Sequence, residues 1–167
     1  MSEITLGIIG GGQLGSMLAI AAKKLDIKII IFCDDIDAPA QNFCNKFIYG
    51  NYNDKEKINE FVKQVSVVTY EFENIPYETL NEINKLKPVL PKPSVNRLIQ
   101  HRLAEKDFIN KLNIRTTRYV SIEKKSDIES LEDFLPGILK TTTLGYDGKG
   151  QHPIKSIKEF DKLNIDF

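Results

Sequence analysis

Residues 4–15 read Ile4-Thr5-Leu6-Gly7-Ile8-Ile9-Gly10-Gly11-Gly12-Gln13-Leu14-Gly15. An apolar run that ends in glycines is typical of a buried parallel strand followed by a tight turn. From Gln13 to Lys24 apolar residues then recur at helical spacing, at Leu14, Met17, Leu18 and Ala21. A second strand is expected over 28–32 and ends just before Asp34-Asp35. This order of strand, glycine-rich turn, helix and strand predicts a Rossmann-like α/β sheet.

The alternation of strands and helices continues to about residue 90. We expect strands at 47–49 and 65–69 and helices at 54–64, with Asp54 near its start, and at 77–86. Three prolines, Pro88, Pro91 and Pro93, then surround Val89-Leu90. Because proline cannot continue a helix, a strand end and a domain boundary are expected there. We therefore assign residues 1–92 to a first domain.

The second part, residues 93–167, has a different order of elements. We expect a helix capped by Ser94 and running to Gln100, a helix over 102–112, a strand over 117–122, a helix over 127–134, a strand over 138–140, a return strand from Pro153 and a last helix from Ser156. A glycine-rich loop lies between the last two strands. Strand, loop and return strand predict a hairpin lid rather than the strand-to-helix turn of a phosphate loop.

Composition and charge exclude several classes of protein. The chain has 167 residues, of which 41% are apolar and 28% charged, as in an ordinary globular protein. Lys plus Arg and Asp plus Glu both number 23, so there is no basic surplus for nucleic acid or an anionic membrane. Cys33 and Cys44 are expected to be unpaired thiols, and two histidines are too few to suggest zinc. We expect a cytoplasmic protein with neither a signal peptide nor a membrane span.

The first glycine turn leaves several ligands open. Gly10-x-Gly12-x-x-Gly15 fits the dinucleotide fingerprint, and Asp34 follows Gly15 by 19 residues. NAD(P) or another nucleotide or ribotide would fit this turn, and a purely structural turn is the third possibility. Gln13 mildly disfavours NAD(P), because its side chain offers a hydrogen bond inside the crevice.

Two carboxylates follow the strand at 65–69. The segment Tyr70-Glu71-Phe72-Glu73-Asn74-Ile75-Pro76 begins at the carboxyl end of that strand, the edge where parallel sheets bind ligands. In an extended segment Glu71 and Glu73 point the same way, so both could grip ribose hydroxyls. Alternatively, one of them caps the next helix.

A second glycine-rich stretch lies near the C-terminal end of the chain. Lys140 is followed by Gly145-Tyr146-Asp147-Gly148-Lys149-Gly150-Gln151. Glycines with two nearby lysines make a flexible basic loop whose N–H groups can cover polyphosphate oxygens. It is not a Walker A loop, because Gln151 and not Lys-Ser/Thr follows the last glycine.

The order and spacing of these motifs match those of one protein family, which also has a motif such as Arg102-Leu-Ala-Glu105-Lys106 between them. The chain resembles the N-terminal part of the N5-carboxyaminoimidazole ribonucleotide synthetases, ATP-grasp ligases of purine biosynthesis. The resemblance covers the whole chain. It implies that residues 1–92 are a Rossmann-like pre-ATP-grasp domain. Residues 93–167 would then be linker helices and the first, incomplete part of an ATP-grasp domain.

The resemblance also implies roles for individual residues. ATP would be bound by Arg102, Lys140, Gly145, Tyr146, Asp147, Gly148, Lys149, Gly150 and Gln151, and aminoimidazole ribonucleotide by Gln13, Leu14, Glu73 and Tyr146. Residues 145–151 would form a lid over the triphosphate. The local alternatives are that Arg102 pairs only with Glu105 or Asp107 and that Tyr146 only packs the loop.

The chemistry that the resemblance implies is ATP-dependent carboxylation. Bicarbonate attacks the γ-phosphate to give carboxyphosphate, which delivers carbon dioxide to the N5 amine of the ribotide. Lysine, arginine and Mg²⁺ would neutralise the phosphates, and no residue suggests a covalent protein nucleophile. Full-length members of the family are expected to form homodimers.

The chain departs from the family pattern in two places and in its length. Thr141-Thr142-Thr143 stands where basic residues are common, and His101 stands where an acidic residue is common. Family members are much longer, and the half not included here would carry the Mg²⁺ ligands. We therefore expect a fragment that is inactive alone. Two other interpretations stay open: an NAD(P) oxidoreductase domain and a non-catalytic nucleotide-binding or assembly module.

Overall fold

A computed structural model describes residues 4–145, 148–160 and 162–163 of the chain. Its contacts divide the chain into two compact units, unit 1 (Met1–Leu98) and unit 2 (Ile99–Phe167), which are described separately. A domain boundary near residue 92 stays a prediction.

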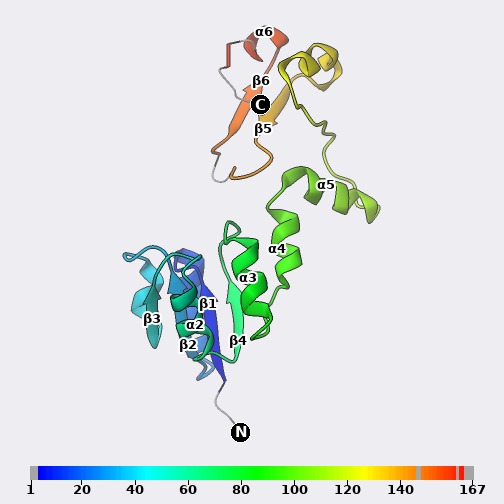
Figure 1. Cartoon of the computed structure of the whole chain (residues 1–167). Coiled ribbons are helices and arrows are strands. Elements are labelled where there is room, and N and C mark those ends of the chain that lie inside the picture. The colour runs from blue at the N-terminus through cyan, green and yellow to red at the C-terminus, as the bar shows by residue number, and fades with distance from the viewer. Residues whose placement is uncertain (1–3, 146–147, 161, 164–167) are drawn as a thin grey trace. The chain divides into compact units, whose positions relative to one another are not determined.

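Unit 1 is built on a parallel sheet of four strands (Figure 1). The strands are β1 (Thr5–Ile9), β2 (Lys28–Cys33), β3 (Lys46–Tyr49) and β4 (Val67–Tyr70), in the spatial order β3-β2-β1-β4. Val89 adds a parallel bridge beside Val68, at the strand end predicted between the prolines. This order is that of the Rossmann-like half-sheet, so the predicted α/β fold is confirmed.

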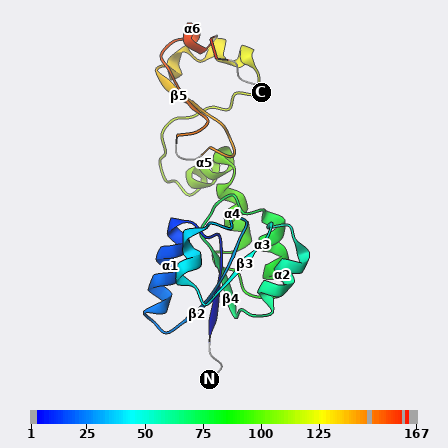
Figure 2. The same cartoon turned by 90° about the vertical axis from the view of Figure 1, so that its left-hand side faces the viewer.

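Helices cover both faces of this sheet (Figure 2). Helix α1 (Gln13–Lys23) and the short 3₁₀ helix η1 (Pro39–Phe43) lie on one face, whereas α2 (Lys55–Val62) and α3 (Tyr77–Asn84) lie on the other. Helix α4 (Pro93–Ile99) follows, and unit 1 ends in its last turn at Leu98. The Asp54 side chain accepts hydrogen bonds from the N–H groups of Glu56 and Lys57, and this cap confirms the predicted start of α2.

The strand sequences show why both faces need a cover. Along β2, Ile29 and Ile31 pack toward α1 and η1, while Ile30 and Phe32 pack toward α2 and α3. Successive side chains of a strand point to opposite faces, so a run without polar alternation is buried on both. Phe32 and Phe61 form the aromatic centre of the second layer, with ring centroids 5.7 Å apart.

Helix α1 turns small residues toward the sheet and its large apolar residues outward. Its buried residues are Gly15, Ser16, Ala19 and Ala22. By contrast, Leu14, Met17 and Leu18, on whose spacing the helix was predicted, are 57%, 58% and 40% exposed. Small side chains let the helix approach the sheet closely. The spacing of the large apolar residues therefore predicted the helix correctly but did not predict which of its faces is buried.

Unit 2 is smaller and has its own core of Ile128, Ile154 and Phe160. Its elements are α5 (Arg102–Lys111), the 3₁₀ helices η2 (Lys125–Ser130) and η3 (Glu132–Phe134), the strands β5 (Gly137–Lys140) and β6 (Gln151–Ile154), and α6 (Ile157–Phe160). Strands β5 and β6 pair antiparallel, which confirms the predicted hairpin around the glycine loop.

Three sequence predictions of local structure were wrong. Residues 117–122 form no strand; the Lys106 ammonium donates to the Thr117 carbonyl (3.0 Å) and holds this segment to α5. Residues 127–134 do not form the single helix that was expected but belong to two short 3₁₀ helices, η2 and η3, which are separated at Leu131. Ser94 is not a cap, because α4 begins at Pro93, a residue favoured in the first helical turn.

Cys33 and Cys44 are both free, as predicted. Within the described residues, no helix is both long and apolar enough to cross a membrane.

Candidate functional site

The carboxyl edge of the unit 1 sheet brings two predicted segments together. Ile9 pairs with Tyr70, so the glycine turn after β1 and the acidic segment after β4 start side by side. There the Glu71 carboxylate accepts a hydrogen bond from the Gly12 N–H at 2.9 Å. Gly10 has φ of 97°, and a Cβ on it would lie 2.7 Å from the same carboxylate oxygen. Glu71 therefore fills the turn.

This contact changes the interpretation of the fingerprint Gly10-x-Gly12-x-x-Gly15. In a dinucleotide site the N–H groups of this turn meet a pyrophosphate. Here a carboxylate of the chain occupies that position, and a phosphate beside it would bring like charges together. The arrangement disfavours NAD(P) at this turn. It also places Glu71 at the start of α1, and not at the next helix, where Pro76 is the N-cap residue and no side chain caps it.

The predicted ribotide residues surround this turn without entering it. Gln13 and Leu14 are exposed in the first turn of α1, where the N–H groups have no acceptor within the helix. Glu73 is exposed in the turn that follows β4. Residues 71–74 form a bend and a turn, so the extended segment expected to carry both carboxylates is not formed. The roles of Gln13, Leu14 and Glu73 stay predictions.

In unit 2, Arg102 is bonded to the glycine loop. Its backbone N–H donates to the Thr142 carbonyl (2.8 Å), and its guanidinium Nη2 donates to the Gly145 carbonyl (3.3 Å). Its Nε is buried and has no hydrogen-bond partner among the described residues. Asp107, one of the two carboxylates expected to compete for Arg102, instead accepts a hydrogen bond from the Tyr119 hydroxyl.

Thr141 lies at the base of the glycine loop. Its N–H donates to the Gly150 carbonyl (3.0 Å), which closes the hairpin. A Cβ on Gly145 would lie 2.9 Å from its hydroxyl oxygen, and a Cβ on Gly150 only 2.6 Å from it. Sequence reasoning noted only that Thr141-Thr142-Thr143 stands where basic residues are common, and it missed this role. The one feature of the sequence that could have indicated this role is the small β-branched residue directly after Lys140.

The remaining loop residues lie around this base. Lys140 ends β5 opposite Gln151 and is exposed, and Gly148 and Lys149 are exposed as well. The exposed ammonium of Lys140 leaves a positive charge where the hairpin enters the loop. Tyr146 and Asp147, both predicted ATP residues, lie outside the described residues.

His101 has a structural role that its position in the sequence did not reveal. Its Nδ1 accepts a hydrogen bond from the Ala104 N–H (3.4 Å) and caps α5, the helix that begins with Arg102. The imidazole replaces the acidic residue common at this position as the acceptor at the helix start.

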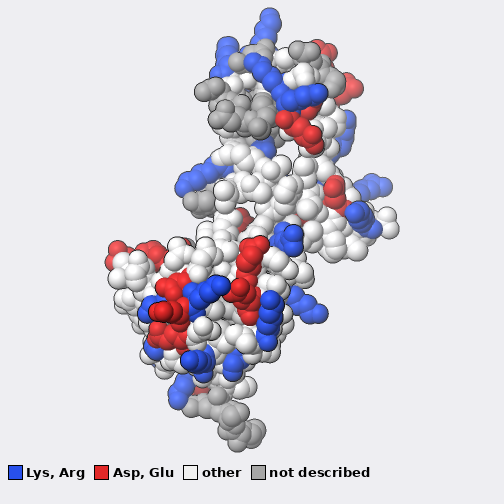
Figure 3. All heavy atoms as spheres, in the orientation of Figure 1, with Lys and Arg blue, Asp and Glu red and all other residues white. Residues whose placement is uncertain are grey.

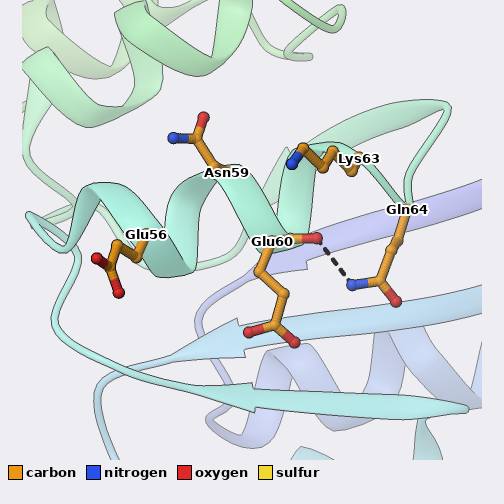
Figure 4. Close-up of a pocket in the computed structure, with 5 residues that line it drawn as sticks. All are labelled: Glu56, Asn59, Glu60, Lys63 and Gln64. Atoms are coloured by element: carbon orange, nitrogen blue, oxygen red, sulfur yellow. Dashed lines mark hydrogen bonds between the residues drawn. The ribbon is translucent and has the colours of Figure 1, made fainter.

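A surface hollow of unit 1 is lined by none of the site residues described above (Figure 4). It measures about 460 Å³ and is lined by Glu56, Asn59, Glu60, Lys63 and Gln64 of α2 and the turn after it. Hydrogen bonds from Lys46 and Lys57 lower the pKa of the Glu60 carboxyl.

Acidic and basic side chains are interspersed on the face of the molecule seen in Figure 3. The described residues include no group of three or more His, Cys, Asp or Glu side chains that could hold a metal.

Comparison with known families accounts for both units. The family described as ribonucleotide synthetase preATP-grasp domain matches residues 3–100, and the ATP-grasp domain matches residues 107–165. The chain belongs to the ribonucleotide synthetase preATP-grasp family.

Relatives of this preATP-grasp chain include purine-synthesis enzymes. It is 44% identical to a bifunctional purine synthesis protein of Dictyostelium discoideum, over 97% of this chain and 16% of that protein. It is 38% identical to N5-carboxyaminoimidazole ribonucleotide synthase of Staphylococcus epidermidis, over 95% of this chain and 43% of that protein. The crystal structure of N5-carboxyaminoimidazole synthetase from Staphylococcus aureus complexed with ADP has a TM-score of 0.89 at 34% identity, over 95% of this chain and 43% of that one. The preATP-grasp chain thus spans less than half the length of these synthetases.

Proposed function

We propose that this chain forms the ribotide-binding unit and the first ATP-binding hairpin of an N5-carboxyaminoimidazole ribonucleotide synthetase. The likeness to such synthetases over 95% of the chain, one of them solved with ADP, carries the proposal. The enzyme would be an ATP-dependent ligase of purine biosynthesis. A homodimer and a cytoplasmic location, both expected from the sequence, belong to the same proposal.

In the proposed ATP site, unit 2 supplies the cations and the covering loop. Arg102 is bonded to the loop at Gly145, so its fork of donors lies where the loop begins. Lys140 adds an exposed point charge at the end of β5. Residues 145–151, which include Tyr146 and Asp147, would cover the triphosphate and exclude water.

In the proposed ribotide site, unit 1 supplies the carboxyl edge of its sheet. The Glu71 carboxylate already accepts a hydrogen bond from the Gly12 N–H. This edge therefore suits a hydroxyl-rich group of a ligand better than a second anionic group beside the carboxylate. Glu73 can accept from ribose hydroxyls, and Gln13 offers an amide beside Leu14. Tyr146 would lie between the ribotide and the nucleotide.

The proposed reaction needs positioning more than covalent chemistry by the protein. A bicarbonate oxygen attacks the γ-phosphorus of ATP, the bond to the β-phosphate oxygen breaks, and ADP leaves. Carboxyphosphate then releases carbon dioxide and phosphate, and the N5 amine of the ribotide adds to the carbon dioxide and loses a proton. Arg102 and Lys140 would neutralise the charge on the phosphoryl oxygens. Mg²⁺ belongs to the proposal as the counter-ion of ATP, and the described residues include no cluster of side chains that could hold it.

Calorimetric titration of the chain with aminoimidazole ribonucleotide, ATP with Mg²⁺, and NADH tests the proposal. We expect heat with the ribotide or with ATP. Glu73→Ala should weaken ribotide binding while Glu78→Ala, an exposed carboxylate in α3, should not. Lys140→Ala should weaken ATP binding while Lys155→Ala, an exposed lysine in the same unit, should not. Heat with NADH alone would overturn the proposal.

A further inference from the structure

Asn96 of helix α4 is a polar residue in the core of unit 1, with an exposed fraction of 0%. Its Nδ2 donates a hydrogen bond to the Ile75 carbonyl at 3.1 Å. Because a carbonyl only accepts, the amide has to turn its nitrogen toward Ile75, which leaves Oδ1 on the other side. This Oδ1 is buried and has no hydrogen-bond partner in the part of the chain that the structure describes.

A buried acceptor without a partner is unfavourable, so an amide at this position needs a physical reason. Leucine has nearly the same volume and would fill the space without an unsatisfied oxygen. Leucine cannot, however, donate to the Ile75 carbonyl. The hydrogen bond to Ile75 is therefore the property that only the amide of Asn96 supplies here.

The Ile75 carbonyl lies at the end of residues 71–75, the acidic turn that follows β4. At the start of this turn the Glu71 N–H donates to the Ile9 carbonyl of the neighbouring strand (3.1 Å). At its end, Asn96 donates to Ile75, whose side chain is fully buried. Glu73 lies midway between these two attachments and is exposed. The acidic turn is thus fixed at both ends, with the Glu73 carboxylate between them.

The residue after Asn96 contacts the chain just beyond the acidic turn. The Arg97 guanidinium lies over the ring of Tyr77, the first residue of α3, at 4.8 Å from the ring centroid. Asn96 and Arg97 therefore contact the chain on the two sides of Pro76. Arg97 is exposed, where a cation–π contact contributes little. The buried hydrogen bond of Asn96 is accordingly the main attachment of the acidic turn to α4.

We propose that Asn96 is a positioning residue of the ribotide site, which holds the acidic turn so that the Glu73 carboxylate can accept from ribose hydroxyls. A binding group that is already ordered in the free protein loses less conformational freedom when the ligand binds. The inference rests on the role of Glu73 in the proposed function. Asn96 is enclosed in the core, so it acts on the ligand only through the turn.

Asn96→Leu tests the inference, because it removes the donor and nearly keeps the volume. Calorimetric titration of the 167-residue chain with aminoimidazole ribonucleotide should give a dissociation constant about tenfold higher, since the turn would be ordered only on binding. The urea midpoint of unfolding should change little, because the bond to Ile75 and the unsatisfied oxygen are lost together. If leucine prevents folding, Asn96→Ala removes the same donor with a smaller side chain and should weaken binding likewise.

Thr79→Val is the matched control in the same unit. Thr79 is 3% exposed, and its hydroxyl donates to the Tyr52 carbonyl (2.8 Å), in a turn that carries no proposed ligand residue. The valine variant also loses a buried side-chain donor to a backbone carbonyl. It should lower the urea midpoint and leave the affinity for the ribotide unchanged.

A double-mutant cycle with Glu73→Ala distinguishes positioning from a general loss of structure. If Asn96 acts through Glu73, Asn96→Leu should weaken ribotide binding by less than about twofold once Glu73 is alanine. Backbone amide relaxation of the free chain gives a second readout that needs no ligand. The order parameters of Phe72, Glu73 and Asn74 should fall in Asn96→Leu and stay unchanged in Thr79→Val.

The outcomes separate this inference from the proposed function. Unchanged ribotide affinity in Asn96→Leu, additive losses in the cycle, or unchanged order parameters in the acidic turn would overturn the positioning role. A chain that binds no ribotide, but whose acidic turn loses order in Asn96→Leu, would overturn the proposed function and would support the attachment of the turn by Asn96.

Discussion

The Glu71 carboxylate accepts a hydrogen bond from the Gly12 N–H, so two segments 59 residues apart in sequence share one turn at the edge of the sheet. The glycines of this turn accommodate a side chain of the protein itself. A fingerprint that commonly indicates a pyrophosphate site is here part of the framework, and any ligand at this edge has to bind beside a carboxylate.

Replacing Glu71 should cost stability, whereas replacing Glu73 should cost ligand binding. Glu71→Ala leaves the Gly12 N–H without its acceptor and should lower the free energy of unfolding of unit 1 by about 1–2 kcal/mol. Glu73→Ala, two residues away and exposed, should change it by less than about 0.5 kcal/mol. Urea denaturation measures both. Equal losses in the two variants would contradict a framework role for Glu71.

The loop base should show coupling between Thr141 and Gly150. Gly150→Ala places a Cβ against the Thr141 hydroxyl and adds a side chain at φ of 63°. Gly148→Ala adds the same strain at φ of 80° but meets nothing within 4 Å, so it should cost only about 1 kcal/mol.

A second substitution separates the steric cost from the backbone cost. In a Thr141→Ala background, Gly150→Ala should be at least about 0.5 kcal/mol less destabilising than in the original chain, because the clashing hydroxyl is gone. Thermal unfolding of the original chain, the two single variants and the double variant gives this coupling energy. Strict additivity would show that Thr141 does not fill the loop base.

Arg102 should be distinguishable from a simple positive charge. Arg102→Lys keeps the charge but cannot both donate to Gly145 and present a fork to a phosphate. We expect it to weaken ATP binding by about tenfold. Arg118→Lys is the matched control, because Arg118 stacks on Phe134 in the same unit. Calorimetric titration with ATP reports both variants, and unchanged affinity in Arg102→Lys would exclude a bidentate role.

The pH dependence of unit 2 should include Tyr119. The hydrogen bond that its hydroxyl donates to Asp107 raises the pKa of Tyr119, because the phenolate would face a carboxylate. Since the pKa is higher in the folded chain, the stabilisation is complete below the ordinary tyrosine pKa and is lost as the pH rises through the folded value.

Ultraviolet titration of phenolate, with Tyr119→Phe subtracted, measures this group. Asp107→Asn should lower the pKa of Tyr119, and Glu105→Gln, on the same helix but without a contact to Tyr119, should not. A pKa that Asp107→Asn leaves unchanged would contradict the assigned cause.

Local sequence patterns predicted an element correctly where its conformation depends on residues within that element. Asp54 caps α2 as predicted, and the apolar runs before Gly10 and around Ile30 are strands because they can be buried on both faces. The prediction of a strand over 117–122 was wrong, because β-branched and aromatic residues favour a strand only where a neighbouring strand can pair with them. Here Lys106 and Asp107 hold Thr117 and Tyr119 to a helix instead.

By itself, the amino-acid sequence determined the Rossmann-like order of elements, the hairpin around the glycine loop and the family resemblance. These depend on the spacing of apolar residues and glycines along the chain, which short-range sterics and hydrogen bonding convert into local structure. Only the tertiary structure decided that Glu71 fills the turn of Gly12, that Thr141 underlies Gly150, and that α1 turns Met17 outward. Each of these depends on which atoms meet across the fold, and a one-dimensional pattern does not contain those distances.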